Sequence, residues 1–176
     1  MNKQMRYWIR RILLVVMAGM VAFALYQTIS GKQSKSPEVG EKAPDFELKT
    51  LDGETMKLSD LRGQAVLINF WATWCEPCRD EMPAIQNVYD RYKEQGFEVV
   101  AVNIAEAPVS VRGFARQLEL DFPILLDRDR KVTNQYDIGP IPSSLLIDQE
   151  GKVVRKHSGQ MQEKQIEGYV REALAR

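Results

Sequence analysis

The sequence is poor in the side chains that bind soft metals. Its 176 residues include two cysteines, Cys75 and Cys78, and one histidine, His157. A structural zinc ion is held by four ligands, most often cysteine and histidine, and these three residues are too few to supply them. They also exclude the dense disulfide framework of a small secreted scaffold. We therefore expect no metal site and no bound cofactor, and we expect His157 to be an ordinary surface residue.

The sequence also lacks an excess of charge of one sign. It has 24 lysines and arginines and 24 aspartates and glutamates. The first eleven residues carry four of the basic residues and no acid, so the remainder has 20 basic and 24 acidic residues. Because no basic stripe is concentrated in this larger part, we expect no nucleic-acid partner.

Charged residues are absent from one long N-terminal segment. Residues 12–29 are mostly apolar and contain no charge, and their number approaches the roughly 20 residues that a membrane-spanning helix needs. The basic residues that precede them predict a cytoplasmic N-terminus, by the positive-inside rule. A cleaved signal peptide is the alternative, with Ala22-Phe23-Ala24 as its cleavage site. The length of the apolar stretch favours an uncleaved anchor.

These patterns divide the chain into three parts. Residues 1–30 are expected to be a signal-anchor that contacts the membrane through residues 12–29 and leaves the rest of this single-pass protein outside the cytoplasm. Residues 31–43, rich in Ser, Lys, Gly and Glu, are expected to be a flexible tether. Residues 44–176 are long enough for one domain with its own core, which we expect to be monomeric.

Hydrophobic patterning predicts an α/β domain in residues 44–176. An N-terminal hairpin is expected around Asp52-Gly53. Alternating buried strands and amphipathic helices follow, and then a second hairpin and a last helix. The strands are predicted at residues 65–71, 97–104, 122–126, 144–147 and 152–156, and the helices at 76–95, 109–120, 128–136 and 162–174.

Both cysteines lie where the strand 65–71 meets the first turn of the following helix. The unpaired N–H groups and the positive dipole end of a helix N-terminus stabilise a thiolate. We expect Cys75 to be exposed and nucleophilic. Cys78, one turn later, is expected to be covered but close enough to attack a mixed disulfide formed at Cys75. The pattern predicts a redox-active disulfide, Cys75–Cys78.

The segment 71–78, Trp-Ala-Thr-Trp-Cys-Glu-Pro-Cys, resembles the active site of the thioredoxin superfamily. Glu81, the later Ile141-Pro142 and the membrane-type N-terminus are most similar to its TlpA/ResA-like branch. The resemblance covers almost the whole chain. It implies a thioredoxin fold, which is a central mixed sheet flanked by helices, here with the N-terminal hairpin and a βα-type insertion. It also implies an extracytoplasmic thiol-disulfide oxidoreductase.

The resemblance implies a substrate and a partner. Proteins of the ResA type reduce the disulfide of Cys-x-x-Cys-His sites in apocytochrome c before haem is attached, and they draw electrons from a CcdA-type membrane thiol carrier. The alternatives are a reductase or oxidant of other exported proteins, for example in spore-envelope assembly, and a peptide-binding module whose cysteines only stabilise the fold. Peroxide reduction is disfavoured, because a peroxiredoxin needs Thr three residues before its reactive cysteine and this chain has Ala72 there.

Glu81 lies three residues after Cys78, one turn further along the same predicted helix, so it can share the helix face that contacts the buried thiol. In most thioredoxins the buried proton acceptor is an Asp six positions before the first cysteine, and this chain has Asn69 there. Glu81 is therefore the candidate to take the proton of Cys78. The alternative is an acid that only decorates the first turns of a helix.

The residues between the cysteines are expected to adjust the active site. A carboxylate at Glu76 disfavours a neighbouring thiolate, which makes the dithiol less stable and favours a reductant over an oxidant. Pro77 lacks an N–H group and stiffens the start of the helix, where proline is tolerated.

Four further residues are candidates for contact with substrate. The resemblance implies that Pro142 is a cis-proline facing the cysteines and that the backbone of Ile141 pairs with a substrate peptide. By sequence alone, Pro142 could simply begin a strand. Glu106 follows the strand 97–104 and falls at the edge of the sheet where the cysteines emerge, although a solvated loop carboxylate is an equal alternative. Trp74, together with Trp71, is expected to pack around the site and restrict access.

Overall fold

The computed structural model of the chain describes residues 3–30 and 36–175, which form two separate units divided after residue 33. The first unit is a single helix, α1 (Lys3–Ser30). It contains a stretch, Gln4–Ala24, that is long and apolar enough to cross a membrane. The helix covers the predicted apolar segment 12–29 and begins before it. Residues 31–35 of the expected tether lie outside the described residues.

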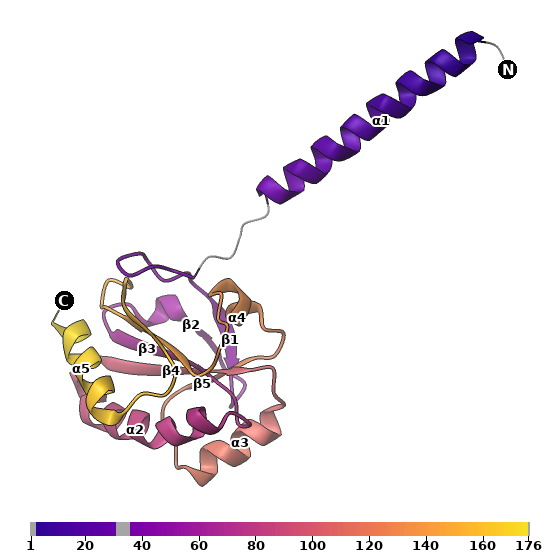
Figure 1. Cartoon of the computed structure of the whole chain (residues 1–176). Coiled ribbons are helices and arrows are strands. Elements are labelled where there is room, and N and C mark those ends of the chain that lie inside the picture. The colour runs from indigo at the N-terminus through magenta and orange to yellow at the C-terminus, as the bar shows by residue number, and fades with distance from the viewer. Residues whose placement is uncertain (1–2, 31–35, 176) are drawn as a thin grey trace. The chain divides into compact units, whose positions relative to one another are not determined.

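The second unit is built on one mixed sheet (Figure 1). Within the described residues its seven strands lie in the order β2-β1-β5-β4-β3-β6-β7. The central strands β3, β4 and β5 run parallel, and the other pairs are antiparallel. The strands are β1 (Glu47–Thr50), β2 (Thr55–Lys57), β3 (Ala65–Trp71), β4 (Phe97–Ile104), β5 (Ile124–Asp127), β6 (Ser143–Ile147) and β7 (Val153–Ser158).

Helices cover both faces of this sheet (Figure 1). On one face lie α2 (Glu76–Tyr92), α3 (Pro108–Gln117) and α5 (Glu163–Leu174), and on the other η1 (Leu58–Leu61) and α4 (Lys131–Gln135). Every residue of β3 is buried, as expected of a central parallel strand with both faces covered. Its side chains alternate, so that Leu67 and Trp71 face α2 whereas Ile68 and Phe70 face the opposite layer.

The order of these elements confirms the predicted thioredoxin fold. The strand–helix unit of β5 and α4 lies between α3 and β6 in the chain. Strand β5 pairs with β4 on one side and with the N-terminal hairpin, β1 and β2, on the other. The hairpin β6–β7 lies at the opposite side, next to β3.

Three predicted helices differ at their ends. The helix predicted at residues 109–120 already ends at Gln117. The last turn of the helix predicted to reach Gln95 is a separate 3-10 turn, η2 (Lys93–Gln95), and Gly96 ends it with a φ of 84°. Helix α4 begins later than residue 128, because the Asp127 carboxylate accepts hydrogen bonds from the N–H groups of Val132 and Thr133. A carboxylate bound in this way caps the N-terminus of a helix.

The described part of the expected tether is attached to the domain. The N–H of Gly40 donates to the Val153 carbonyl at 2.8 Å, and the N–H of Ala43 donates to the Gly151 carbonyl at 3.0 Å. Ala43 is buried. The folded unit therefore starts ahead of residue 44, with residues 40–43 bound along the β6–β7 hairpin.

Candidate active site

The end of β3 delivers the chain directly to the cysteines. Cys75 is the N-cap of α2, and it forms a disulfide with Cys78 with an S–S distance of 2.10 Å and a Cα–Cα distance of 5.3 Å. The backbone N–H of Cys78 donates to Cys75 Sγ at 3.3 Å. The pair therefore lies at the positive end of α2, where unpaired N–H groups favour negative charge on sulfur.

The two sulfurs differ in exposure, but the expectation that Cys75 is exposed is wrong in this disulfide form. Cys75 is 6% exposed, whereas Cys78 is completely buried. The physical reason is that Cys75 Sγ lies 3.7 Å from the carbonyl oxygen of Ile141, in the loop that faces it. Cys75 remains the member of the pair that a second molecule can approach first.

Glu76 and Pro77 occupy the first turn of α2, between the cysteines. Both side chains are exposed. The Glu76 carboxylate thus lies at the N-terminus of the helix, where it competes with the thiolates for the same positive end of the dipole. Its effect on the stability of the dithiol stays a prediction.

Glu81 lies on α2 and is completely buried between this helix and strand β3. Its Oε1 accepts a hydrogen bond from Asn69 Nδ2 at 2.8 Å, and its Oε2 accepts one from the backbone N–H of Met161 at 2.9 Å. Burial raises the pKa of Glu81 to about 7, and the two hydrogen bonds oppose that rise. A carboxyl that titrates near neutral pH is suited to accepting and returning a proton.

Sequence reasoning identifies Glu81 but not the partners of its carboxylate. Asn69 stands out in the sequence only because most thioredoxins have an Asp at that position. The structure places it beside Glu81, since β3 lies directly under α2. Met161 lies 80 residues away in sequence, in the segment before α5, and its contribution is a backbone amide that no sequence pattern marks.

The Ile141–Pro142 peptide bond is cis, as the resemblance implies. The loop that contains it enters β6, which pairs with β3 so that Ser143 lies opposite Phe70. The Pro142 carbonyl accepts a hydrogen bond from the N–H of Gly159 at 2.8 Å. This pairing fixes the loop next to the N-terminus of α2, where Ile141 approaches Cys75.

Glu106 lies at the same edge of the sheet, just after β4. It is half-buried, and its carboxylate accepts hydrogen bonds from the Thr73 N–H at 2.7 Å, from Thr73 Oγ1 at 2.5 Å and from Asn103 Nδ2 at 2.7 Å. The sequence singles out Glu106 but misses Thr73 and Asn103. Contact between Glu106 and a substrate stays a prediction; in this structure its two oxygens bind the loop that precedes Cys75.

The two tryptophans of the motif differ from the expectation that both pack around the site. Trp71 is completely buried, and its ring lies 5.1 Å from that of Phe114. Trp74 is 70% exposed. The reason is the direction of the chain: Trp71 ends the buried strand, whereas Trp74 lies in the loop that leaves it. Trp74 therefore does not close the site by packing over it.

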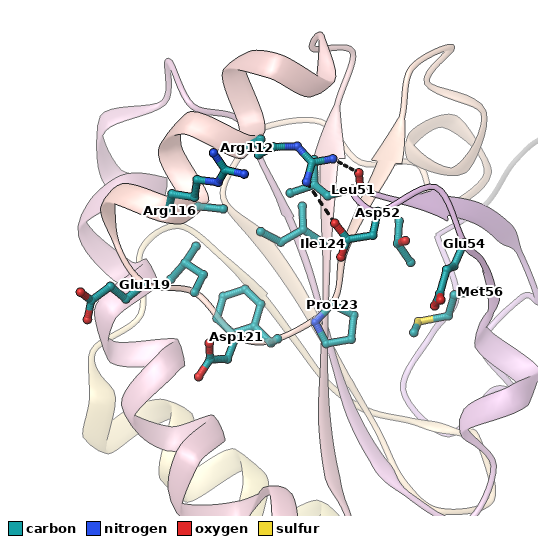
Figure 2. Close-up of a pocket in the computed structure, with 14 residues that line it drawn as sticks. Leu51, Asp52, Glu54, Met56, Arg112, Arg116, Glu119, Asp121, Pro123 and Ile124 are labelled. Carbon is teal, nitrogen blue, oxygen red and sulfur yellow. Dashed lines mark hydrogen bonds and ion pairs between the residues drawn. The ribbon is translucent and has the colours of Figure 1, made fainter.

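A cleft of the domain lies away from the cysteines (Figure 2). It has a volume of about 510 Å³ and is bounded by the β1–β2 hairpin, α3 and the chain that leads into β5. Arg112 extends from α3 to the hairpin, where it donates to the carbonyl of Leu51 and to the carboxylate of Asp52. Neither cysteine is among the residues that line this cleft.

Comparison with known proteins bears on this site. The model of the AhpC/TSA family matches residues 39–156. The thiol-disulfide oxidoreductase ResA of Bacillus subtilis is 42% identical over 171 residues, which cover 97% of this chain and 94% of that protein. A ResA of Bacillus cereus is 40% identical over 168 residues, which cover 96% of each chain.

Solved structures agree with these relatives. A thiol:disulfide interchange protein DsbE from Chlorobium tepidum superposes with a TM-score of 0.74 at 36% identity, covering 79% of this chain and 99% of that one. StoA from Bacillus subtilis superposes with a TM-score of 0.64 at 30% identity, covering 72% of this chain and 96% of that one.

The family match includes both cysteines and the Ile141–Pro142 loop. The ResA relatives match over almost the full length of the chain. The disulfide at the N-terminus of α2 is the reactive group that such an activity requires. The chain therefore belongs to the AhpC/TSA family of thioredoxin-like proteins and is a ResA-like thiol-disulfide oxidoreductase.

Proposed function

We propose that this oxidoreductase is an extracytoplasmic reductant whose substrate is the Cys-x-x-Cys-His disulfide of apocytochrome c, which it opens before haem attachment. The observation that supports the exchange chemistry is the Cys75–Cys78 disulfide at the start of α2, where Cys75 alone has accessible surface. The choice of substrate is supported by the similarity to ResA proteins.

In the proposed reaction Cys75 is the nucleophile of the reduced protein. Its thiolate attacks one sulfur of the substrate disulfide, forms a mixed disulfide and releases the other substrate sulfur as a thiolate. Glu81 then accepts the proton of Cys78, and the Cys78 thiolate attacks Sγ of Cys75. This second attack forms the Cys75–Cys78 disulfide and releases the remaining substrate sulfur. The substrate gains two electrons and the protein dithiol loses two.

A substrate peptide is proposed to bind along the loop at Ile141 and Pro142. The backbone next to a sheet can pair with an extended peptide as an added strand, and the approach of Ile141 to Cys75 Sγ would bring such a peptide to the nucleophile. Trp74, which is largely exposed, and Glu106, which binds the loop that precedes Cys75, are further proposed contacts.

The oxidised protein must be reduced again before the next cycle. We propose that a CcdA-type membrane thiol carrier supplies two electrons by the same exchange, with its own dithiol attacking Cys75. Helix α1 is the proposed anchor that keeps the domain near such a carrier, with the N-terminus in the cytoplasm and the domain outside. Glu76 supports a reducing role, since its charge disfavours the dithiol form.

Trapping tests the substrate assignment. The full-length Cys78→Ser variant cannot resolve a mixed disulfide and should accumulate covalently bound apocytochrome c on Cys75, while a Cys75→Ser, Cys78→Ser double variant should bind none. Cells that lack the protein should lose c-type cytochromes. Normal cytochrome levels in such cells, without a suppressor mutation, would remove the assignment.

Two further measurements separate the alternatives. A strongly oxidising reduction potential would indicate an oxidant of exported proteins rather than a reductant. A peptide-binding module would keep its activity in the double serine variant, whereas an exchange enzyme loses all of it. A disulfide that closes so short a loop also contributes little as a structural staple.

A further inference from the structure

Glu81 is connected through Asn69 to the strand that follows the cis-proline loop. The two N–H groups of the Asn69 amide are both used: one donates to Glu81 Oε1 at 2.8 Å and the other to Ser144 Oγ at 3.0 Å. All three side chains are buried. Ser144 lies opposite Asn69 in the β3–β6 register, so the pairing of the two strands sets the direction of the amide.

The orientation of this amide is informative. Asn69 Oδ1 is buried and has no hydrogen-bond partner among the described residues, an arrangement that costs free energy. Turning the amide over would bring Oδ1 against Glu81 Oε1, and two acceptors repel each other unless the carboxyl carries a proton. In this arrangement Asn69 offers a donor to Glu81, and a donor at this position stabilises the ionised carboxylate.

Among the described residues, no charged side chain contributes to the pKa of Glu81. The segment before α5 contributes the backbone N–H of Met161, and α2 contributes Cys78 one turn earlier. From β7, the register sets His157 beside Ser144, and its ring contacts Gln165 and Tyr169 of α5. Burial is the one cause that raises the pKa of Glu81, and no charged side chain of the described residues adds to it.

We propose that Asn69, held in place by Ser144, is a positioning residue that keeps the buried Glu81 carboxylate in its ionised, proton-accepting form. The inference rests on the proposed function in one respect, which is that the Glu81 carboxylate accepts the proton of Cys78. Without the amide, the Met161 N–H would be the one hydrogen-bond donor left to Glu81 among the described residues. Its proton would then be held more tightly at neutral pH, and less carboxylate would be ready to accept the proton of Cys78.

The test follows the protonation of Glu81 directly. Infrared spectra of the oxidised full-length protein in detergent, recorded against pH, should contain a carboxylic-acid carbonyl band that is missing in Glu81→Gln. In the wild type this band should disappear with a midpoint near pH 7. In Asn69→Leu the midpoint should rise by about one pH unit, since a hydrogen bond to a charged group is worth roughly a tenfold change in proton affinity.

Asn103 provides a matched control. It is a buried asparagine on the neighbouring strand β4, it also has an unpartnered Oδ1 among the described residues, and it donates to a different carboxylate, that of Glu106. Asn103→Leu should leave the Glu81 midpoint at its wild-type value. An unchanged midpoint in Asn69→Leu, or an equal rise in Asn103→Leu, would overturn the proposal.

Two additions keep the test decisive. If Asn69→Leu does not fold, Ser144→Ala removes the acceptor that orients the amide and should raise the midpoint in the same direction by a smaller amount; no rise in this variant overturns the proposal. Exchange rates of the same variants with a disulfide peptide are measured separately. A shifted midpoint with unchanged rates from pH 6 to 8 would contradict Glu81 as the proton acceptor, while the role of Asn69 would stand.

Discussion

The Glu106 carboxylate accepts a hydrogen bond from the backbone N–H of Thr73 at 2.7 Å, which joins the loop after β4 to the loop that carries Trp74 and Cys75. The residue before it, Ala105, has a φ of 57°, a left-handed conformation that is unfavourable for alanine. The chain thus adopts an unfavourable backbone at the point where Glu106 reaches the active-site loop. The geometry assigns to Glu106 a structural function in addition to any contact with substrate.

Removal of this carboxylate should destabilise the domain. Glu106→Ala deletes three hydrogen bonds and leaves the amides of Thr73 and Asn103 without their acceptor. We expect a loss of about 2–3 kcal/mol in the free energy of unfolding of the oxidised protein, measured with urea. Thr73→Val removes only the hydroxyl bond and should cost about 1 kcal/mol. Equal stability of Glu106→Ala and the wild type would contradict the structural function.

Glu81 should make the stability of the oxidised protein depend on pH. Its pKa is about 7 in the folded protein and has the ordinary value of about 4.5 in the unfolded chain. Between these values the folded protein holds a proton that the unfolded chain has lost, so stability falls as the pH rises through this window. The difference corresponds to about 3 kcal/mol.

Urea unfolding at pH values from 4 to 8 measures this dependence. Glu81→Gln should remove most of the fall in stability, because its side chain does not titrate. Glu54→Gln changes an exposed glutamate and should follow the wild type. If the free energy of unfolding of Glu81→Gln fell with pH as steeply as that of the wild type, the titration of other groups would be the cause and this prediction would be wrong.

Glu76 should shift the reduction potential without changing the fold. Replacing it by Gln removes a negative charge from the first turn of α2 and stabilises the thiolates of the reduced form, so the potential should become more oxidising. Since Glu76 is exposed, the expected change is about 10–20 mV, measured by equilibration with glutathione. Asp80→Asn, an exposed acid further along α2, should have a smaller effect. A more reducing potential in Glu76→Gln would contradict this account.

The sequence is sufficient to predict the order of strands and helices, the cysteines at the start of a helix and the position of Glu81 on that same helix. These features depend on local patterns: a fully apolar strand, a Cys-x-x-Cys at a helix start and an acid one turn later. The hydrogen-bond partners of Glu81 and Glu106 could not be predicted, because they come from segments that are distant in the sequence. The Met161 amide reaches Glu81 across 80 residues, and Thr73 binds Glu106 across 33.

Exposure is the other property that the local pattern cannot decide. The position of Cys75 ahead of the helix predicts an exposed thiol, but the cis-proline loop, 66 residues later, covers it. The aromatic motif predicts that Trp74 packs around the site, but the turn of the chain after β3 directs it outward. Both outcomes depend on the three-dimensional arrangement of loops at one edge of the sheet.

The two tryptophans offer a test that separates binding from stability. Trp74→Ala removes an exposed ring and should leave the free energy of unfolding within about 0.5 kcal/mol of the wild type. Its KM for a peptide with a Cys-x-x-Cys-His disulfide should rise, because the ring supplies apolar contact area beside Cys75. Trp71→Ala is the matched variant: it empties a buried site against Phe114 and should cost about 3–5 kcal/mol. An unchanged KM in Trp74→Ala would exclude this ring from substrate binding and leave the Ile141–Pro142 loop as the contact to examine.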